Sequence, residues 1–392
     1  MSRRYIGSFI DAFNALKVAN SPTIGTATAG NAQACVTFTA PACVGGGAIS
    51  SFTAVSCPEF KTGSGATSPV SVTGLTNCTA YTFKVNATNV FGPSAFSAAS
   101  NSATPFPSGT FAIFALGSSA TTIRNKYTYS GDVNAVATAS SVCSVGGAAA
   151  GTVTVGIFAI GATPDCASTT RNKYTYSGCV SASATASSVV SRDGSAAGNA
   201  TVGIFALGKT TNPSTTRDKY TYSGCTSASA TSASAATFGG SAAGNSTVGI
   251  FALGSNICCS TTTRNKYTYS NNANASATAA SAASHFGSAT GNDTVGIFAL
   301  GFASCDLSTT RNKYTYSGCT SASATSASNS SRRGAAAGNA TVGIFALGCA
   351  PCASTTRNKY TYSGCVSASA TAASAASRSG AAASNGTTGV NT

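Results

Sequence analysis

The chain has 392 residues, of which 8% are charged and 43% hydrophobic, and 22 lysine and arginine residues outnumber 8 aspartate and glutamate residues. That length suffices for two or three domains. The 14 tyrosines and 19 phenylalanines recur at regular positions, which excludes a disordered chain of low hydrophobicity and few aromatic residues. The net charge of +14 favours polyanionic partners: nucleic acid, an acidic polysaccharide or lipopolysaccharide, or an acidic protein surface.

The first 20 residues are predicted to be a docking segment. Two arginines stand near the start, but Asp11, Asn14 and Lys17 interrupt any apolar stretch behind them, which excludes a secretory signal. The chain contains no run of 18 apolar residues, so we expect no membrane span. We therefore expect synthesis in the cytoplasm.

Residues 21–105 carry the signals of a β-sandwich. Residues 36–39, 51–55 and 81–87 alternate apolar and polar side chains, as half-buried strands do, and turn clusters such as 42–47 separate them. Several short strands with turns every 8–12 residues are typical of sandwich folds.

The segment GLTNCTAYTFKV, residues 74–85, resembles a fibronectin type III domain. In that family a leucine followed six positions later by a tyrosine forms the tyrosine corner, which the resemblance assigns to Leu75 and Tyr81. The chain departs from the family at Phe38, where an early-strand tryptophan is usual. The resemblance implies a spacer or adhesive module rather than a chemical activity.

Residues 106–392 consist of a six-fold repeat. One block close to TVGIFALG recurs with a block close to RNKYTYS, at a period of 46 or 47 residues after a slightly shorter first unit. Each unit supplies four strand candidates, which in the last complete unit are a small strand (334–339), an apolar strand (341–348), a tyrosine strand (357–363) and a Ser/Ala/Thr strand (367–376). We expect the tyrosine strand to have one apolar and one solvated face. Four strands graded from small to bulky predict the blade of a β-propeller.

The ends of the repeat predict how the ring closes. The first unit begins directly at its apolar strand, whereas the last unit continues past its Ser/Ala/Thr strand to the small segment 380–385. Pairing that segment with the first unit would complete six blades, so the predicted class is all-β: a fibronectin-type sandwich followed by a six-bladed propeller closed by its C-terminal strand. The blocks resemble a divergent kelch propeller, although Gly348 and its equivalents stand alone instead of in a doublet and the chain has no tryptophan.

Histidine and carboxylate residues that could catalyse a reaction are few, and we expect a protein that is not an enzyme and has no cofactor or metal. The single histidine, His285, has no predicted nucleophile or carboxylate partner, and it aligns with Arg192, Arg333 or Arg378 in other units. The carboxylates form no close pair in the sequence; they are Asp11, Glu59, Asp132, Asp165, Asp193, Asp218, Asp293 and Asp306. A glycan-processing enzyme with acidic residues in a central channel remains the alternative from another class.

The basic residues of the tyrosine strands are predicted to form a ring. They are Arg124, Lys126, Arg171, Lys173, Arg217, Lys219, Arg264, Lys266, Arg311, Lys313, Arg357 and Lys359. One interpretation is an electrostatic collar that contacts an acidic glycan or another polyanion. The other, which we favour, is a solvated edge that keeps a Ser/Ala-rich surface soluble, because repeated residues are usually architectural.

The 15 cysteines fall into groups by position. Cys179, Cys225, Cys319 and Cys365 follow the tyrosine strand, at the opposite end of the predicted propeller from the variable loops before that strand. Candidates for disulfides that lock loops or subunits are Cys143, Cys166, Cys258, Cys259, Cys305, Cys349 and Cys352, with Cys35, Cys43, Cys57 and Cys78 in the first module. Cys143 could reach Cys166. One CxxC, Cys349 to Cys352, is a weak signal for redox or zinc chemistry.

The fibronectin-plus-propeller layout resembles structural proteins of tailed phages of aquatic bacteria. That resemblance implies a virion protein made in the host cytoplasm and exposed to an oxidising exterior after lysis, which suits its many cysteines. Residues 1–20 would dock on other virion proteins, and homo-oligomers could form. The variable loops, such as 209–213, 255–259 and 302–307, would recognise a host-surface glycan as part of a tail fibre or baseplate appendage. A head-decoration protein is the alternative, and no nucleic-acid partner is expected.

Overall fold

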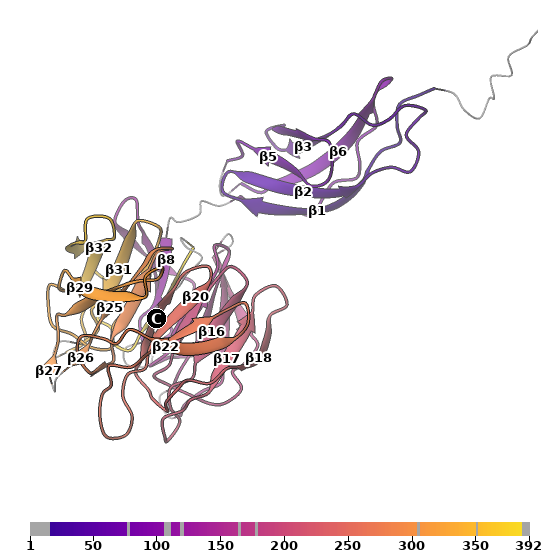
Figure 1. Ribbon diagram of the computed structural model, residues 1–392. Coiled ribbons are helices and arrows are strands. Elements are labelled where there is room, and N and C mark those ends of the chain that lie inside the picture. The colour runs from indigo at the N-terminus through magenta and orange to yellow at the C-terminus, as the bar shows by residue number, and fades with distance from the viewer. Residues whose placement is uncertain are drawn as a thin grey trace, which may run out of the picture. The chain divides into compact units, whose positions relative to one another are not determined.

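The computed structural model describes residues 16–76, 79–105, 111–117, 121–163, 166–176, 179–303, 306–349 and 352–385. The described residues form β-strands and no helix, and these strands pair antiparallel. The predicted all-β class is therefore confirmed. The chain divides into two compact units, Met1–Ser108 and Gly109–Thr392 (Figure 1). No helix among the described residues is long and apolar enough to cross a membrane.

The first unit contains two sheets that share one core. One sheet has the order β1 (Thr23–Gly30), β2 (Gln33–Thr39), β5 (Val70–Thr73), and the other has the order β4 (Thr62–Gly65), β3 (Ser51–Cys57), β6 (Thr82–Asn89), β7 (Gly92–Pro93). Alternate residues of β2, β3 and β6 are buried between the sheets, as the period of two predicts. The two sheets therefore form a β-sandwich.

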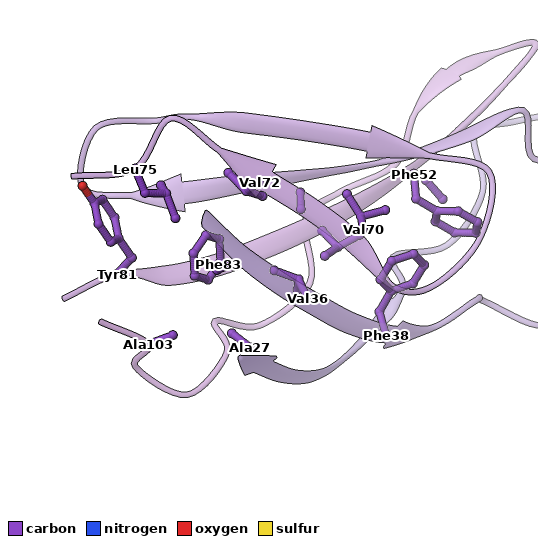
Figure 2. Close-up of a cluster of buried hydrophobic side chains, with 14 of the residues drawn as sticks. Ala27, Val36, Phe38, Phe52, Val70, Val72, Leu75, Tyr81, Phe83 and Ala103 are labelled. Carbon is purple, nitrogen blue, oxygen red and sulfur yellow. The ribbon is translucent and has the colours of Figure 1, made fainter. Parts of the chain in front are cut away.

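Aromatic side chains close the two ends of this core, as Figure 2 shows. At one end the Tyr81 hydroxyl accepts a hydrogen bond from the backbone nitrogen of Thr76 at 2.9 Å, next to buried Leu75. At the other end the rings of Phe38 and Phe52 lie 4.7 Å apart. Tyr81 thus bonds to the residue that follows Leu75, both Tyr81 and Leu75 belong to the core, and Phe38 packs against Phe52.

Part of the predicted docking segment belongs to the sandwich. The backbone nitrogen of Lys17 donates to the Gly45 carbonyl at 2.9 Å, and that of Asn20 donates to the Cys43 carbonyl at 3.0 Å. Ala19 between them is buried in the core of the unit. Residues 1–15 lie outside the described residues.

The second unit contains six four-stranded sheets, each ordered from a small strand to an outer strand. The first sheet contains, from the small strand outward, β34 (Ala381–Ser384), β8 (Phe111–Ala115), β9 (Arg124–Thr128) and β10 (Val133–Ala137). The second contains β11 (Ala148–Gly151), β12 (Val155–Ala159), β13 (Arg171–Thr175) and β14 (Val180–Ala184). The third contains β15 (Ser195–Gly198), β16 (Val202–Ala206), β17 (Arg217–Thr221) and β18 (Thr226–Ala230). The other three are β19 (Ser241–Gly244), β20 (Val248–Ala252), β21 (Arg264–Thr268), β22 (Ala273–Ala277); β24 (Ser288–Gly291), β25 (Val295–Ala299), β28 (Arg311–Thr315), β29 (Thr320–Ala324); and β30 (Ala335–Gly338), β31 (Val342–Ala346), β32 (Arg357–Thr361), β33 (Val366–Ala370).

The small strands follow one another in a cycle. β11 contacts β15, β15 contacts β19, and the series continues through β24, β30 and β34 back to β11. Every residue of these strands is buried, and most are alanine, glycine or serine, so backbones can approach closely. The first sheet takes its small strand from the C-terminal segment, because Ala381–Ser384 pairs with residues 112–115 of β8, as the sequence predicts.

A closed series of backbone hydrogen bonds runs around one end of these strands. Its six members, in chain order, are Gly146, Asp193, Gly239, Phe286, Arg333 and Ser379. The backbone nitrogen of each member donates to the carbonyl oxygen of the member before it, at 2.6–2.8 Å, and the nitrogen of Gly146 donates to the carbonyl oxygen of Ser379. We call these six residues the axial ring. All six have a left-handed backbone, with φ between 52° and 66°, including four that are not glycine.

Candidate functional site

The arginines of the predicted basic ring are internal. Arg124, Arg171, Arg217, Arg264, Arg311 and Arg357 are each 0–1% exposed. The guanidinium of Arg217 reaches the next sheet, where it donates to Asn265 Oδ1 at 3.2 Å and Asn274 Oδ1 at 3.0 Å and lies 4.6 Å from the ring centre of Phe251. Burial lowers the pKa of Arg217 to about 10.

All six junctions between sheets repeat this arrangement, which we call the arginine latch. At the junction between the last sheet and the first, Arg357 donates to Asn125 Oδ1 at 3.3 Å and Asn134 Oδ1 at 2.8 Å and lies 4.6 Å from the ring centre of Phe114. The prediction that the arginines contact a ligand is therefore wrong, and so is the prediction of a solvated edge. Both faces of a tyrosine strand are covered, because each sheet lies between two others.

The amide acceptor of each latch is itself held by the preceding sheet. Asn265 Oδ1 also accepts from the Ser234 backbone nitrogen at 3.0 Å, and Asn265 Nδ2 donates to Ser234 Oγ at 2.8 Å. At one junction an aspartate replaces the asparagine, and the Arg171 guanidinium lies 2.8 Å from Asp218 Oδ2 in a fully buried ion pair. Repetition of the basic residues thus reflects architecture.

The lysines of the predicted ring are half-buried, and several also reach the next sheet. Lys173, Lys266 and Lys313 each donate to the sulfur of a turn cysteine, at 3.6–3.7 Å; the acceptors are Cys225, Cys319 and Cys365. Lys219 donates to Asn272 Oδ1 at 3.3 Å. The turn residue adopts a left-handed backbone in every sheet, with φ near 50°. Four of the six lysines of the predicted basic ring are therefore engaged in contacts within the protein.

The carboxylates lie apart in the described part of the chain. Asp218 belongs to the latch, and Asp193 is half-buried in the axial ring. Asp132 is also half-buried and accepts hydrogen bonds from the Tyr127 hydroxyl and the Thr371 backbone nitrogen, whereas Glu59, Asp293 and Asp306 are exposed. Asp11 and Asp165 lie outside the described residues. No group of three histidine, cysteine, aspartate or glutamate residues that could hold a metal ion occurs among those described.

His285 belongs to the loops around the axial ring. Its Nδ1 shares a 2.7 Å hydrogen bond with Ser260 Oγ, and its ring contacts Phe286 and Phe302. Burial lowers the pKa of His285, and nearby cationic side chains, of which Arg332 is the strongest, lower it further. The strand register aligns His285 with Arg332, because His285 pairs with Phe302 as Arg332 pairs with Cys349; the predicted alignment with Arg333 was off by one residue.

The structure contains no disulfide between the candidate cysteines it describes. Cys143 and Cys166 flank one ladder, in which Val145 pairs with Ala162 and Ala162 pairs with Ala167, but both are thiols. Free thiols are also found at Cys35, Cys43, Cys57, Cys258, Cys259 and Cys352. Cys349 is buried. Cys78 and Cys305 lie outside the described residues, and the predicted loop locks stay predictions.

The variable loops meet the axial ring at one end of the second unit, which we call the loop end. Short ladders join the residue before five of the ring positions to the loop that follows the apolar strand, as in Arg192 with Lys209 and Phe238 with Ser255. In one repeat the ladder is a small sheet of β23 (Ser284–His285), β26 (Phe302–Ala303) and β27 (Asp306–Leu307). The predicted contact loops are thus fixed on the scaffold beside the ring.

Positive charge gathers at the loop end. Its cations are Arg192, Lys209, Arg332, Arg333 and Arg378, and Asp193 is a carboxylate of the ring. Burial lowers the pKa of Arg333; Asp193 opposes that shift, and the three neighbouring arginines add to it. Burial also lowers the pKa of Lys209, whose Nζ lies 3.9 Å from Asp193 Oδ2. Crowded cations of this kind favour an anionic ligand.

Aromatic rings alternate with these cations. Lys209 lies 3.7 Å from the ring centre of Phe238, and Arg333 lies 4.1 Å from that of Phe286. The two phenylalanine rings are 5.8 Å apart in an edge-to-face arrangement. Sequence reasoning missed this cluster, although one signal was present: the residue before each small-strand glycine changes from repeat to repeat, while the strands hardly change.

No protein-family model and no curated protein matches the chain. Among solved structures it is similar to titin kinase with its flanking domains, at 26% identity, and to a crystal structure of domains from titin, at 22% identity. These likenesses cover 22% and 23% of this chain, and 17% and 32% of those chains, each at a TM-score of 0.20. Likenesses of this extent identify no family.

Proposed function

We propose that the second unit is a six-bladed β-propeller closed by its C-terminal strand. Three observations support this proposal: six four-stranded sheets, a cyclic order of contacts between their small strands, and the pairing of β34 with β8. The axial ring and the six arginine latches add two further closed series of contacts. Radial blades with small inner strands have these properties.

The first unit is proposed to be a fibronectin type III module that acts as a spacer. Support comes from its sheet orders, β1-β2-β5 and β4-β3-β6-β7, and from the hydrogen bond between the Tyr81 hydroxyl and Thr76.

The whole protein is proposed to be a non-enzymatic virion component, a tail fibre or baseplate appendage that recognises an acidic host-surface glycan through the loop end. The observation that carries this proposal is the contrast between near-identical, fully packed strands and a variable loop end rich in arginine and aromatic residues. A rigid scaffold with divergent loops at one end is a common design for recognition. Burial of the latch arginines leaves the loop end, where the sequence also placed recognition, as the proposed contact surface.

Gold-labelled antibody against residues 109–392, imaged on particles from a lysate containing the protein, tests the proposal. Label at the tail tip is the expected result. Label spread over the shell would favour head decoration on a negatively charged lattice, and labelled cells with bare particles would contradict a virion role. A glycan-processing enzyme would instead release fragments from the host polysaccharide, and the expected result is no release.

A further inference from the structure

At three junctions between sheets, a lysine side chain contacts the thiol of the turn that follows the next tyrosine strand. The lysine Nζ and the cysteine Sγ are 3.6–3.7 Å apart in these pairs, which are Lys173 with Cys225, Lys266 with Cys319 and Lys313 with Cys365. The two members of each pair belong to different sheets and lie 52 or 53 residues apart in the sequence. Every member is half-buried, so a small oxidant in solution can reach the contact.

We propose that these three contacts are sites of oxidative cross-linking, in which hydrogen peroxide converts the thiol to a sulfenic acid and the lysine amine then forms a covalent S–N bond to the sulfur. In the first step the thiol gives two electrons to the peroxide, its sulfur gains one oxygen as S–OH, and one water is released. In the second step the neutral amine attacks the sulfur and the S–O bond breaks. The departing hydroxide takes a proton from the amine and leaves as water.

A further contact holds each turn against the sheet that carries the lysine. The Thr185 hydroxyl donates to the Cys225 carbonyl oxygen, and equivalent threonines make the same bond to the other two turns. The Cys225 thiol donates to the Tyr222 carbonyl oxygen at 3.7 Å, so its sulfur keeps a lone pair for the Nζ of Lys173. Amine and sulfur thus begin in contact, which removes much of the entropic cost of joining them.

Comparison of the repeats shows that the turn does not need a cysteine for its shape. Its backbone is left-handed, with a φ of 49° at Cys225, a conformation that asparagine and aspartate accept more readily than other side chains. Asn272 occupies the equivalent turn with a φ of 56° and accepts a hydrogen bond from Lys219 Nζ at 3.3 Å. Asparagine therefore satisfies both the backbone and the lysine, and what a thiol adds is its reactivity.

The links would join neighbouring sheets by covalent bonds. Lys173 and Cys225 belong to the second and third sheets, and the other two pairs connect the fourth sheet to the fifth and the fifth to the sixth. A cross-link that closes a long loop restricts the unfolded chain and so stabilises the folded one. Oxidation would therefore strengthen the second unit. This chemistry is independent of the proposed glycan recognition.

Peptide mass spectrometry on the full chain, treated with hydrogen peroxide and digested without a reductant, tests the cross-links. The expected products are three pairs of linked peptides, each lighter than the sum of its two peptides by two hydrogen atoms and separated again by dithiothreitol. The midpoint of urea unfolding should move to higher urea after peroxide and return with dithiothreitol. Disulfides between these cysteines, sulfenic or sulfinic acids without a lysine link, or a link that retains an oxygen atom would overturn the S–N bond.

Three variants make the test specific. Lys173→Arg keeps a positive charge beside Cys225, but a guanidinium stays protonated and cannot attack, so dimedone should trap the sulfenic acid of Cys225 while the other two links form. Cys225→Asn should fold, because Asn272 already occupies the equivalent turn, and should lose the same single link.

The third variant, Asn272→Cys, should gain a fourth link, to Lys219. A link from Cys225 to another lysine in Lys173→Arg, or the absence of the fourth link in Asn272→Cys, would overturn the role of the contacts between sheets. Labelling of particles by the antibody does not depend on these thiols, so the proposed function and the cross-links can fail separately.

Discussion

Arg357 donates a hydrogen bond from Nη2 to Asn125 Oδ1 at 3.3 Å, across 232 residues of sequence. The equivalent bond between adjacent repeats, as from Arg311 to Asn358, has a length of 3.1 Å. The junction that joins the last repeat to the first is therefore built from the same contacts as the internal junctions. No cap is needed at either end of the repeat, because each end is the partner of the other.

Replacing Arg357 by glutamine should destabilise the second unit by about 3 kcal/mol. The change removes two hydrogen bonds to Asn125 and Asn134 and the stacking on Phe114, and it leaves buried amides without their donor. Urea unfolding followed by tyrosine circular dichroism measures the loss. Arg378→Gln serves as the matched control, because Arg378 is exposed at the loop end. Equal stability of the two variants would contradict the structural role of the latch.

Asp218→Asn should cost less, about 1–2 kcal/mol. Removing one partner of a buried ion pair usually costs more, but the other five junctions accept an asparagine at this position. The amide can keep the bonds to the Ser188 backbone and to Arg171, so only the charge is lost. The same urea titration provides the measurement, and a loss as large as that of Arg357→Gln would show that the counterion matters more than the hydrogen bonds.

Gly203→Ala should destabilise the second unit by about 1–3 kcal/mol through overpacking. A Cβ at this position would lie 2.7 Å from the Tyr222 hydroxyl and 3.0 Å from the Ala150 Cβ of the neighbouring sheet. Gly224→Ala is the control, since its Cβ would meet only the Thr226 side chain at 3.5 Å. Thermal unfolding of both variants measures the difference, and a harmless Gly203→Ala would mean that the sheets can move apart.

The strands could be predicted from the sequence, but which of their faces are buried could not. The repeat predicted the four strand types and the pairing of residues 381–384 with the first unit, because both follow from counting elements. It did not predict the burial of Arg217 and its equivalents, since an alternating strand was assumed to have one solvated face. When sheets stack around a centre, a charged residue can be buried if the next sheet supplies acceptors, as Asn265 does.

The axial ring could not be predicted from local preferences either. Phe286 and Arg333 adopt a left-handed backbone that such residues rarely take, and they do so because their backbone groups complete a ring of hydrogen bonds. That constraint arises only once all six repeats are assembled. The candidate site was therefore visible in the sequence only as variation before the small-strand glycines.

The stability of the second unit should fall as the pH rises above about 10, the pKa of tyrosine in the unfolded chain. Burial raises the pKa of Tyr220 to about 12 and raises that of Tyr176 and Tyr269 well above the usual value. Above pH 10 the unfolded chain loses tyrosine protons that the folded chain keeps. Each such tyrosine therefore lowers the free energy of unfolding by up to about 1.4 kcal/mol per pH unit. The latch arginines, such as Arg217 with its lowered pKa, act in the opposite direction and reduce the net slope.

Tyr176→Phe isolates the contribution of one tyrosine. No partner for the Tyr176 hydroxyl is found among the described residues, so the variant should change stability little at about pH 8. Between about pH 10 and pH 11 it should lose about 1 kcal/mol less than the wild-type protein, because phenylalanine has no proton to release and the unfolded tyrosine is already half ionised at pH 10. Urea unfolding at the three pH values gives the comparison. Identical slopes for the two proteins would mean that the Tyr176 hydroxyl ionises as readily in the folded chain as in the unfolded one, contrary to its burial.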